Sequence, residues 1–198
     1  MIEFLKVIDE EPFLLFKNYY DKAIINNQKS IHAISISSYS KKNQEVYSRF
    51  VNLKFVDGDR FIFFSNYKSP KAIQFSSHNQ ISSLIYWDKI NVQIRIMANI
   101  KKTDKDFNKE YFKHRNINKN ALAIASEQSM PIKSFDDFKK NYENTFKNVN
   151  LKQCPDYWGG FAFIPYSFEF WEGDKNRLNK RVKYEKNLNN WNKFYLSP

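Results

Sequence analysis

Three basic residues in the first half of the chain could together hold an anion. Arg49 and Lys54 stand in a run of aromatic and β-branched residues, and Lys71 follows Ser69-Pro70. Serine is a favourable N-cap and proline suits the first helical position, so a helix is predicted to begin here. The free N–H groups at a helix start bind anions, and Lys71 adds a full charge. The pattern indicates a phosphate site, although solvated strand cations beside an ordinary helix start would produce it too.

A predicted β-hairpin leads these cations to the start of the helix. The run from Tyr47 to Val56 and the run that begins at Asp59 are joined by Asp57-Gly58. An Asp-Gly pair between two such runs favours a type I′ turn, in which both central residues have positive φ. The helix is expected to run from Pro70 to about residue 78.

Two further pairs of polar residues each share a face of a predicted element. Gln93 and Arg95 alternate with apolar residues in the run 92–101, so they point to the same side of a strand. The spacing Thr103-x-x-Asp106 predicts a helix that runs through about residue 115. On that helix Tyr111 and Arg115 are i, i+4 neighbours and present a hydroxyl and a guanidinium to one place. The strand pair fits a solvated surface as well as a binding site.

The other elements indicate an α+β protein. Helices are predicted at 9–27 and after Ser134. The polar stretch 116–120 is expected to leave the helix that runs through about residue 115. The helix after Ser134 is expected to bury an aromatic stripe made of Phe135, Phe138, Tyr142 and Phe146. Further strands are predicted at 31–38, 81–87, 161–164, 166–171, 182–184 and 191–196, with Pro165 separating two of them. Antiparallel strands with helices between them favour a barrel, and no linker divides residues 1–198 into two domains.

Composition limits the classes of function. Cys154 is the single cysteine, which excludes an internal disulfide and favours a cytoplasmic setting. No apolar run approaches the ~18 residues of a membrane span, and the first residues lack a signal-peptide pattern. The net charge of +11 is scattered, so an anionic small molecule explains it as well as nucleic acid, which is not the expected partner. His32, His78 and His114 show no metal-binding spacing.

A series of motifs connects the chain to a known family. In chain order they are Arg49-Phe-Val-x-Leu-Lys54, Phe-Ser-Asn-Tyr-x-Ser69, Gln93-x-Arg95, Tyr111-Phe-x-x-Arg115, Ser126-x-Gln-Ser129, Trp158-Gly-Gly160, Phe168-Glu-Phe-Trp-Glu-Gly173, Arg177-Leu-Asn-x-Arg181 and Trp191…Leu196-x-Pro198. With these motifs the chain resembles pyridoxine (pyridoxamine) 5′-phosphate oxidase nearly from end to end. The resemblance implies an antiparallel, Greek-key split β-barrel with peripheral helices, a homodimer that binds FMN at its interface. Residues 1–28 would be an N-terminal helical segment, and residues 160–198 would complete the site.

The resemblance also implies a role for each matched position. The implied FMN contacts are Arg49, Phe64, Ser65, Lys71, Gln93, Gln128, Ser129, Trp171 and Arg181. The implied contacts to a phosphorylated substrate are Lys54, Tyr111, Arg115 and Lys119, with Arg177 and Asn179 beside the substrate ring as the catalytic pair. Arg49 and Lys54 are an odd number of residues apart, so on a regular strand they face opposite ways. This fits one contact to the cofactor and one to the substrate.

Four positions depart from the family pattern. Pro70 stands where the family usually has arginine, which removes a phosphate ligand but keeps the helix start. Lys119 replaces serine and raises the positive charge at a substrate position. Asn179 replaces histidine and cannot take up a proton near neutral pH. Phe64 replaces tyrosine.

The implied activity is an FMN-dependent oxidation of pyridoxine or pyridoxamine 5′-phosphate to pyridoxal 5′-phosphate, with oxygen as electron acceptor and hydrogen peroxide as product. One alternative keeps the fold and FMN but changes the substrate, as in related flavoenzymes of phenazine biosynthesis. Lys119 and Asn179 motivate that alternative. Another is a non-catalytic flavin-binding protein, in which Arg177 and the pair Tyr111/Arg115 would have no purpose.

Overall fold

A computed structural model describes residues 1–198 and has the expected α+β architecture. Its strands are β1 (Glu3–Lys6), β2 (Ala33–Ser40), β3 (Glu45–Asn52), β4 (Phe55–Asp57), β5 (Arg60–Asn66), β6 (Gln80–Trp87), β7 (Val92–Lys102), β8 (Trp158–Glu172), β9 (Lys180–Asn187) and β10 (Asn190–Leu196). Its helices are α1 (Glu11–Ile25), α2 (Pro70–Ser77), α3 (Lys105–His114), α4 (Ile117–Ala125) and α5 (Phe135–Asn148), with one 3₁₀ turn, η1 (Asp88–Ile90). None of the helices combines the length and hydrophobicity that crossing a membrane requires.

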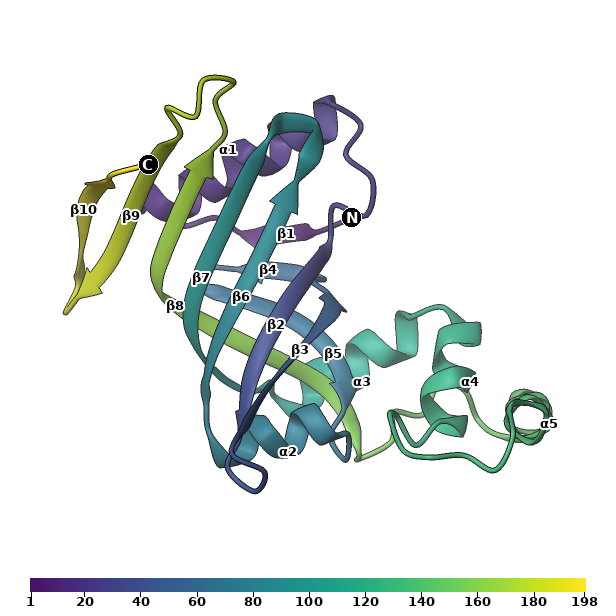
Figure 1. The fold of residues 1–198 in the computed structure, drawn as a ribbon. Coiled ribbons are helices and arrows are strands. Elements are labelled where there is room, and N and C mark those ends of the chain that lie inside the picture. Colours follow the sequence, from purple (N-terminus) through teal and green to yellow (C-terminus); the bar gives the residue numbers. More distant parts are fainter.

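The strands form one strongly curved sheet, a split barrel (Figure 1). Its strand order is β1-β4-β5-β8-β7-β6-β2-β3, and β9 with β10 extends from β8. The pairs are antiparallel except β1–β4, which is parallel and was not expected. The first part of β8 pairs with β5 and the last part pairs with β9, while β7 pairs along the whole strand. This long strand therefore joins the barrel to the C-terminal hairpin.

Alternating apolar residues of the strands fill the barrel. On β7, Ile94 and Ile96 are fully buried between more exposed neighbours. Phe61 of β5 stacks on Phe163 of β8 at 5.2 Å between ring centroids. Burial of each such side chain contributes about 1.5–3 kcal/mol. The core of the barrel is therefore built largely from aromatic and β-branched side chains of the strands.

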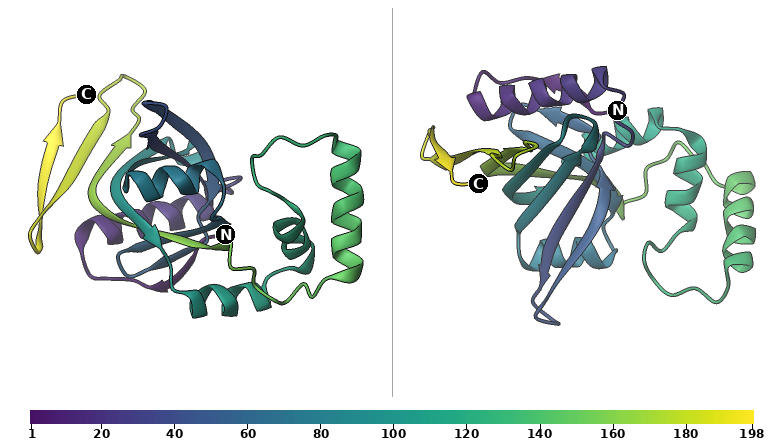
Figure 2. Two further views of the ribbon diagram at one scale, coloured as in Figure 1. Left: turned by 90° about the horizontal axis from the view of Figure 1, so that it is seen from below. Right: turned by 45° about the horizontal axis from the view of Figure 1, so that its top comes forward.

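Two helices cover opposite parts of this core. The predicted N-terminal helix is confirmed as α1, which packs Phe13 and Phe16 against Phe61 at 6.1 and 5.0 Å between centroids. Side chains at the start of α1 also bond to the C-terminal hairpin, since Trp191 Nε1 donates to Glu10 Oε2 at 2.6 Å. The predicted helix at Pro70 is confirmed as α2, which lies at the other end of the barrel (Figures 1 and 2). The open end beside α2 carries the cations discussed below.

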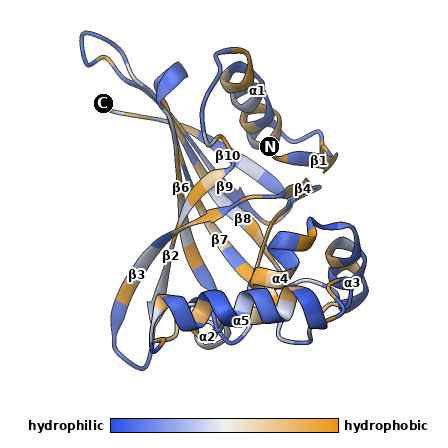
Figure 3. Cartoon of the chain, turned by 90° about the vertical axis from the view of Figure 1, so that its right-hand side faces the viewer, coloured by the Kyte–Doolittle hydropathy of each residue, from blue (hydrophilic) through white to orange (hydrophobic).

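Helices α4 and α5 form an arm that stands away from the barrel (Figure 2). The chain leaves α3 after His114, as expected, but residues 117–120 start a new helix, because Asn116 caps α4 through bonds from the N–H groups of residues 118 and 119. The expected buried stripe on α5 is also wrong. Phe135 is 66% exposed and Phe146 is 37% exposed, and only Thr145 of this helix is buried. Figure 3 shows separate hydrophobic positions on a largely hydrophilic α5. The aromatic residues of α5 have the spacing of a core helix, but within one chain they do not pack into the hydrophobic core.

The central hairpin differs from its prediction in two details. The turn lies at Gly58-Asp59, one residue later than expected, because Asp57 pairs with Arg60. Only Gly58 has a positive φ, 62°, so the turn is not of type I′. In addition, the first run is interrupted at Leu53-Lys54, and its two parts are β3 and β4. Strand alternation therefore does not extend from residue 49 to residue 54.

Two other boundaries differ. Helix α3 is capped by Asp104 rather than Thr103, since Asp104 Oδ1 accepts a bond from Asp106 N at 2.7 Å. Pro165 does not divide two strands. It lies inside β8, where the register with β7 shifts between Met97 and Ala98, so a bulge accommodates the missing N–H group.

Candidate active site

The first functional group of residues surrounds Lys71 at the start of α2. Lys71 is only 8% exposed, and its Nζ donates to Ser65 Oγ at 3.0 Å and to Ser69 Oγ at 3.3 Å. Burial, with a smaller contribution from Arg49, lowers the pKa of Lys71 to about 8. The hydroxyl of Ser69 donates to Asn66 O and does not cap the helix, while Ser69 O accepts bonds from the N–H groups of Ala72 and Ile73. Because Pro70 has no N–H group, the N–H of Lys71 is the one left for a ligand in this first turn.

Arg49 of β3 reaches the same end of the barrel. Its Nη1 donates to Ser38 Oγ at 2.6 Å, and its Nη2 donates to Gln74 Oε1 at 2.9 Å. Burial lowers the pKa of Arg49. Neither Arg49 nor Lys71 forms an ion pair with a carboxylate. A buried lysine and a partly buried arginine without an anion, next to a helix start, fit a bound phosphate group.

The loop after α4 brings Gln128 to this group. Gln128 Oε1 accepts bonds from Ser65 Oγ at 2.9 Å and from Asn66 N at 3.1 Å. Ser129 follows in an exposed position with a φ of 66°. Five predicted cofactor residues, namely Arg49, Phe64, Ser65, Lys71 and Gln128, are therefore gathered around the end of β5 and the start of α2.

The predicted substrate residues lie on an aromatic stack. Tyr111 of α3 stacks on Phe64 with 4.1 Å between ring centroids, and Phe64 stacks on Trp158 at 5.0 Å. The Arg115 guanidinium lies 5.1 Å from the centroid of Trp158, a cation–π contact. Its Nη1 donates to Oδ1 of the fully buried Asn120 at 3.0 Å. The expected neighbourhood of Tyr111 and Arg115 is confirmed, because both border Trp158.

Lys54 and Lys119 add positive charge near this stack. Lys54 lies in the break between β3 and β4, and its Nζ is paired with Glu3 of β1. Burial raises the pKa of Tyr111, and the nearby charges of Lys54 and Arg115 partly oppose this rise. Arg49 and Lys54 do lie in different places, although the break in the strand, rather than alternation, separates them.

One cavity connects the two groups. It has a volume of about 210 Å³ and is lined by Phe64, Ser65, Asn66, Arg115, Lys119, Leu122, Ala123, Ser126, Gln128 and Trp158. Three of these residues were predicted to contact the cofactor and two to contact the substrate. The site residues that sequence reasoning missed are Asn66, Asn120 and Trp158. Asn66 and Trp158 belong to the quoted motifs, which was the available signal, whereas nothing marked Asn120.

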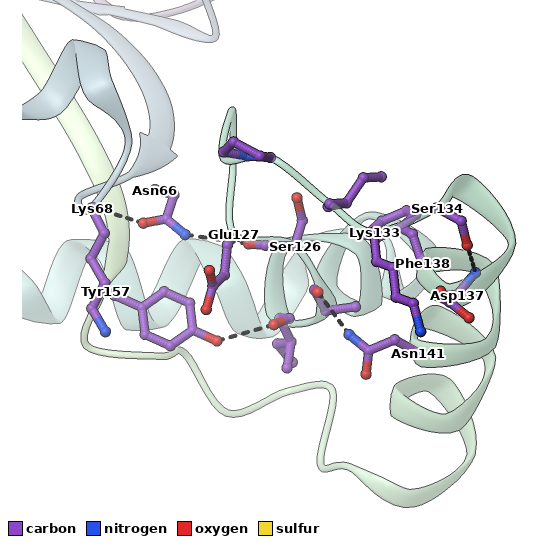
Figure 4. A pocket seen from close by; sticks show the side chains of 14 residues that line it. Asn66, Lys68, Ser126, Glu127, Lys133, Ser134, Asp137, Phe138, Asn141 and Tyr157 are labelled. Carbon is purple, nitrogen blue, oxygen red and sulfur yellow. Dashed lines mark hydrogen bonds between the residues drawn. The ribbon is translucent and has the colours of Figure 1, made fainter.

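A larger cavity of about 470 Å³ lies between the arm and the barrel (Figure 4). It shares Asn66 and Ser126 with the smaller cavity but contains none of the predicted site residues. Tyr157 OH donates to Ile124 O at 3.2 Å, and Asn141 Nδ2 donates to Ala125 O at 2.9 Å. The first bond holds the arm against the barrel beside the candidate site, and the second joins α5 to the end of α4 within the arm.

Three further predicted cofactor residues form what we name the outer row. Gln93 on β7 is directly opposite Trp171 on β8, which is directly opposite Arg181 on β9. Residues paired in this way share a face of the sheet. All three side chains are partly exposed. The expected common face of Gln93 and Arg95 is confirmed by alternation along β7.

The outer row and Arg49 lie on opposite faces of the sheet. Successive pairings connect Arg49 to the buried row of Ile36, Ser83, Ile96 and Phe168. Gln93 is three residues from Ile96 on the same strand, and an odd separation reverses the face. One chain therefore does not bring the two sets of predicted FMN residues together.

Arg177 and Asn179 lie in the loop between β8 and β9, distant from the arm in Figure 1. Arg177 is exposed, with a φ of 64°. Asn179 Oδ1 accepts a bond from Asp174 N at 3.1 Å, and Arg177 N donates to Asp174 O at 3.0 Å. The loop is ordered by these bonds, but neither residue bonds to the predicted substrate group within one chain.

Comparison with protein families agrees with this geometry. The family model described as "Pyridoxamine 5′-phosphate oxidase" matches residues 21–147. A second model, "Pyridoxine 5′-phosphate oxidase C-terminal dimerisation region", matches residues 158–198. The chain belongs to the pyridoxamine 5′-phosphate oxidase family. This membership confirms the resemblance and supports FMN as the cofactor, and the second match places Trp171, Arg177 and Arg181 within the dimerisation region.

Relatives named pyridoxine/pyridoxamine 5′-phosphate oxidase align over most of the chain. The protein of Leptospira interrogans is 29% identical over 196 residues, which are 95% of this chain and 89% of the relative. A protein named pyridoxine/pyridoxamine 5′-phosphate oxidase 1, from Hydrogenovibrio crunogenus, is 32% identical over 196 residues, covering 96% and 90%. These matches support an oxidoreductase of this family.

Solved structures share the fold. PhzG from Burkholderia lata 383, in complex with tetrahydrophenazine-1-carboxylic acid, superposes with a TM-score of 0.90 at 22% identity, over 96% of this chain and 94% of that one. An FMN-binding protein related to pyridoxamine 5′-phosphate oxidase, from Nostoc punctiforme PCC 73102, gives a TM-score of 0.76 at 12% identity, over 92% and 97%. The expected split-barrel fold is confirmed.

Proposed function

We propose that the protein is an FMN-dependent oxidase that converts pyridoxine or pyridoxamine 5′-phosphate to pyridoxal 5′-phosphate. The observation that carries the proposal is a pair of cations without carboxylate partners, the partly buried Arg49 and the buried Lys71. Lys71 bonds to Ser65, which lines a cavity with two further cations, Arg115 and Lys119. Two separate cationic groups fit a phosphorylated cofactor and a phosphorylated substrate. Membership of the family supports the same assignment.

The phosphate of FMN fits the group around Lys71. Lys71 and Arg49 supply the opposite charges, and the hydroxyl of Ser65 supplies a further hydrogen-bond donor or acceptor. Pro70 has no N–H group to donate, but its position at the first turn keeps the helix start next to Lys71. When bound, FMN supplies the acceptor for a hydride from the 4′ carbon of the substrate, and oxygen then takes the electrons to give hydrogen peroxide.

The substrate phosphate is assigned to Lys54, Tyr111, Arg115 and Lys119. Stacking of Arg115 on Trp158 and its bond to Asn120 hold the guanidinium in one orientation before a ligand arrives. Arg177 then lies over the substrate ring and orients it, with Asn179 beside it. In this assignment the phosphate gives affinity, and Arg177 gives the alignment on which turnover depends.

A second copy of the chain completes the site. The outer row lies on the opposite face of the sheet from Arg49, and two of its members, Trp171 and Arg181, belong to the dimerisation region together with the loop that holds Arg177. We assign Gln93, Trp171, Arg177, Asn179 and Arg181 to the side contributed by the partner. The arrangement makes the homodimer obligatory for activity.

Purification of the protein followed by a flavin spectrum tests the proposal. We expect a yellow protein whose heat-released flavin is FMN, and anaerobic addition of pyridoxine 5′-phosphate should bleach the flavin absorbance. Release of FAD as the main flavin, or failure of both phosphate esters to bleach bound FMN, would contradict the proposal.

The second candidate is the same FMN chemistry on an unphosphorylated aromatic acid. Asn179 favours it, because an amide held to Asp174 N cannot exchange a proton with the substrate near neutral pH. Peroxide production from pyridoxine 5′-phosphate, pyridoxamine 5′-phosphate and an aromatic acid separates the candidates. Asn179→His should raise activity on the phosphate esters if the first candidate is correct. Turnover of the acid alone, even by this variant, would establish the second.

A further inference from the structure

Glu169 of β8 lies next to the outer row, two residues before Trp171. Its Oε1 accepts hydrogen bonds from Arg181 Nε at 3.1 Å and Arg181 Nη2 at 2.8 Å, and its Oε2 accepts one from Arg95 Nη1 at 3.1 Å. Glu169 is only 9% exposed. A carboxylate with this burial is costly unless its charge is balanced, and here two arginines from the neighbouring strands balance it. Both carboxylate oxygens of Glu169 therefore accept hydrogen bonds from an arginine.

The register places this carboxylate on the face that carries the outer row. Glu169 is directly opposite Arg95 on β7 and is two residues before Trp171, so all these side chains share one face. Arg181 also donates from Nη1 to Ser197 O at 2.8 Å. Its guanidinium is therefore fixed from two sides, and its position is set before any ligand binds.

We propose that Glu169 is a positioning residue that sets the orientation and the effective charge of Arg181 beside the flavin, and thereby the reduction potential of bound FMN. The inference rests on the proposed function, in which Arg181 contacts FMN. Two-electron reduction gives the flavin ring negative charge near neutral pH, so an adjacent cation stabilises the reduced form. A carboxylate 2.8 Å from Arg181 offsets part of that cation's field. Glu169 therefore holds the potential below the value that Arg181 alone would give.

A purely structural role for Glu169 gives a different expectation. The same bonds connect β7, β8 and β9, so loss of the carboxylate would lower stability whether or not a flavin is near. Stability alone therefore does not identify a positioning role. The potential of bound FMN does, because a connection between strands has no direct effect on it.

The test compares the midpoint potential of bound FMN in the dimeric holoprotein and in Glu169→Gln, measured against redox dyes. Glutamine keeps the shape and an acceptor oxygen but removes the charge. We expect the potential to move to a more positive value, and reduced FMN to bind at least about threefold tighter relative to oxidised FMN than in the wild type. In the Arg181→Gln background the same substitution should leave the potential unchanged.

Glu185→Gln is the matched control. Glu185 lies on β9 four residues from Arg181, so it shares the face, and it pairs with Lys183 instead. Its substitution should not move the potential. If Glu169→Gln does not fold, Arg95→Gln supplies the second variant. Without Arg95, the carboxylate of Glu169 is balanced by Arg181 alone, so the potential of bound FMN should move to a more negative value.

The outcomes separate this inference from the function on which it rests. A wild-type protein that binds no FMN overturns both. A wild-type protein that binds FMN, with an unchanged potential in Glu169→Gln, overturns only the role of Glu169. A shift of equal size in the Arg181→Gln background or in Glu185→Gln also overturns it, because the effect would then not pass through Arg181.

Discussion

The inner cations and the outer row differ in what a single chain provides for them. Lys71 is buried and Arg49 is partly buried, and both have only hydroxyl, amide and carbonyl partners, so their charge is not balanced. Arg181 in the outer row is balanced by Glu169 but remains partly exposed beside Trp171. The first group lacks an anion, whereas the second lacks a covering surface.

This difference indicates why one ligand between two chains can complete both groups. A buried cation without a counter-ion costs free energy, and a bound phosphate removes much of that cost. Apolar surface beside the outer row, such as the 55% exposed Tyr86 directly opposite Gln93, gains free energy when it is covered. The two deficits are complementary: a ligand between two chains supplies the inner cations with an anion and the outer row with a cover.

The largest effect is expected at Lys71. Lys71→Met removes the buried charge but keeps a side chain of similar length. Because a charge-assisted hydrogen bond contributes about 1.5–3 kcal/mol, FMN affinity should fall about tenfold to a hundredfold. Fluorescence titration of FMN-free protein measures the change. Lys68→Met is the control, since Lys68 is exposed and lies over Tyr157, 5.2 Å from its ring centroid. Equal losses in both variants would contradict a specific role for Lys71.

The next effect concerns the substrate and not the cofactor. Arg115→Ala removes the guanidinium that stacks on Trp158 and should raise the KM for the phosphate esters by about tenfold, with FMN affinity unchanged. Steady-state peroxide production together with FMN titration measures both quantities. Lys113→Ala, on the exposed part of the same helix, should leave both unchanged. Loss of FMN binding in Arg115→Ala would show that the two cationic groups are not separate.

The elements that local patterns predict well are those in which the pattern and the packing agree. The alternation in 92–101 predicted β7, and Ser69-Pro70 predicted the start of α2, because each depends on a few adjacent residues. The stripe on α5 has the same helical period as a core helix, yet Phe135 is exposed. Periodicity shows which residues share a face but not whether anything covers that face.

The site residues also divide into those that a local pattern predicts and those that depend on the packing of distant segments. Lys71 was identified from the chemistry of a helix start, and its burial without a carboxylate strengthens that interpretation. The separation of Arg49 from Lys54 was expected from alternation, but an interruption of the strand causes it. Asn120 holds Arg115 only because α3, α4 and the segment at Leu151 meet there, since Asn120 Nδ2 donates to Phe112 O and Leu151 O. No local pattern encodes such a meeting of distant segments.

Hybrid dimers test whether the two groups act across the interface. Lys71→Met alters the inner group, and Arg177→Ala alters the loop assigned to the partner. A mixed dimer of the two variants contains one site with both changes and one site with neither. Purified mixed dimers should therefore show about half of wild-type activity at FMN concentrations that leave Lys71→Met unloaded. Tagged purification of the mixed dimers and a peroxide assay give the measurement. No recovery above the two parent variants would show that each site is built from one chain.

The smallest effect is a pH dependence of the FMN-free protein. The pKa of Lys71 is lowered from 10.5 to about 8, so between these values the folded protein binds fewer protons than the unfolded chain. Stability contributed by this position should rise as the pH increases from about 8 to 10.5, and the full cost of the buried cation is present below pH 8. Lys71→Met removes the cation and should be the more stable protein at pH 7, by a margin that narrows toward pH 10. Urea unfolding of both FMN-free proteins at several pH values measures the margin. Saturation with FMN should reverse the order at pH 7, because the phosphate then balances the charge that is costly in its absence. A variant that is less stable than the wild type at pH 7 without FMN would show that the hydroxyl partners alone stabilise Lys71, and the contrast between the inner cations and the outer row would fail.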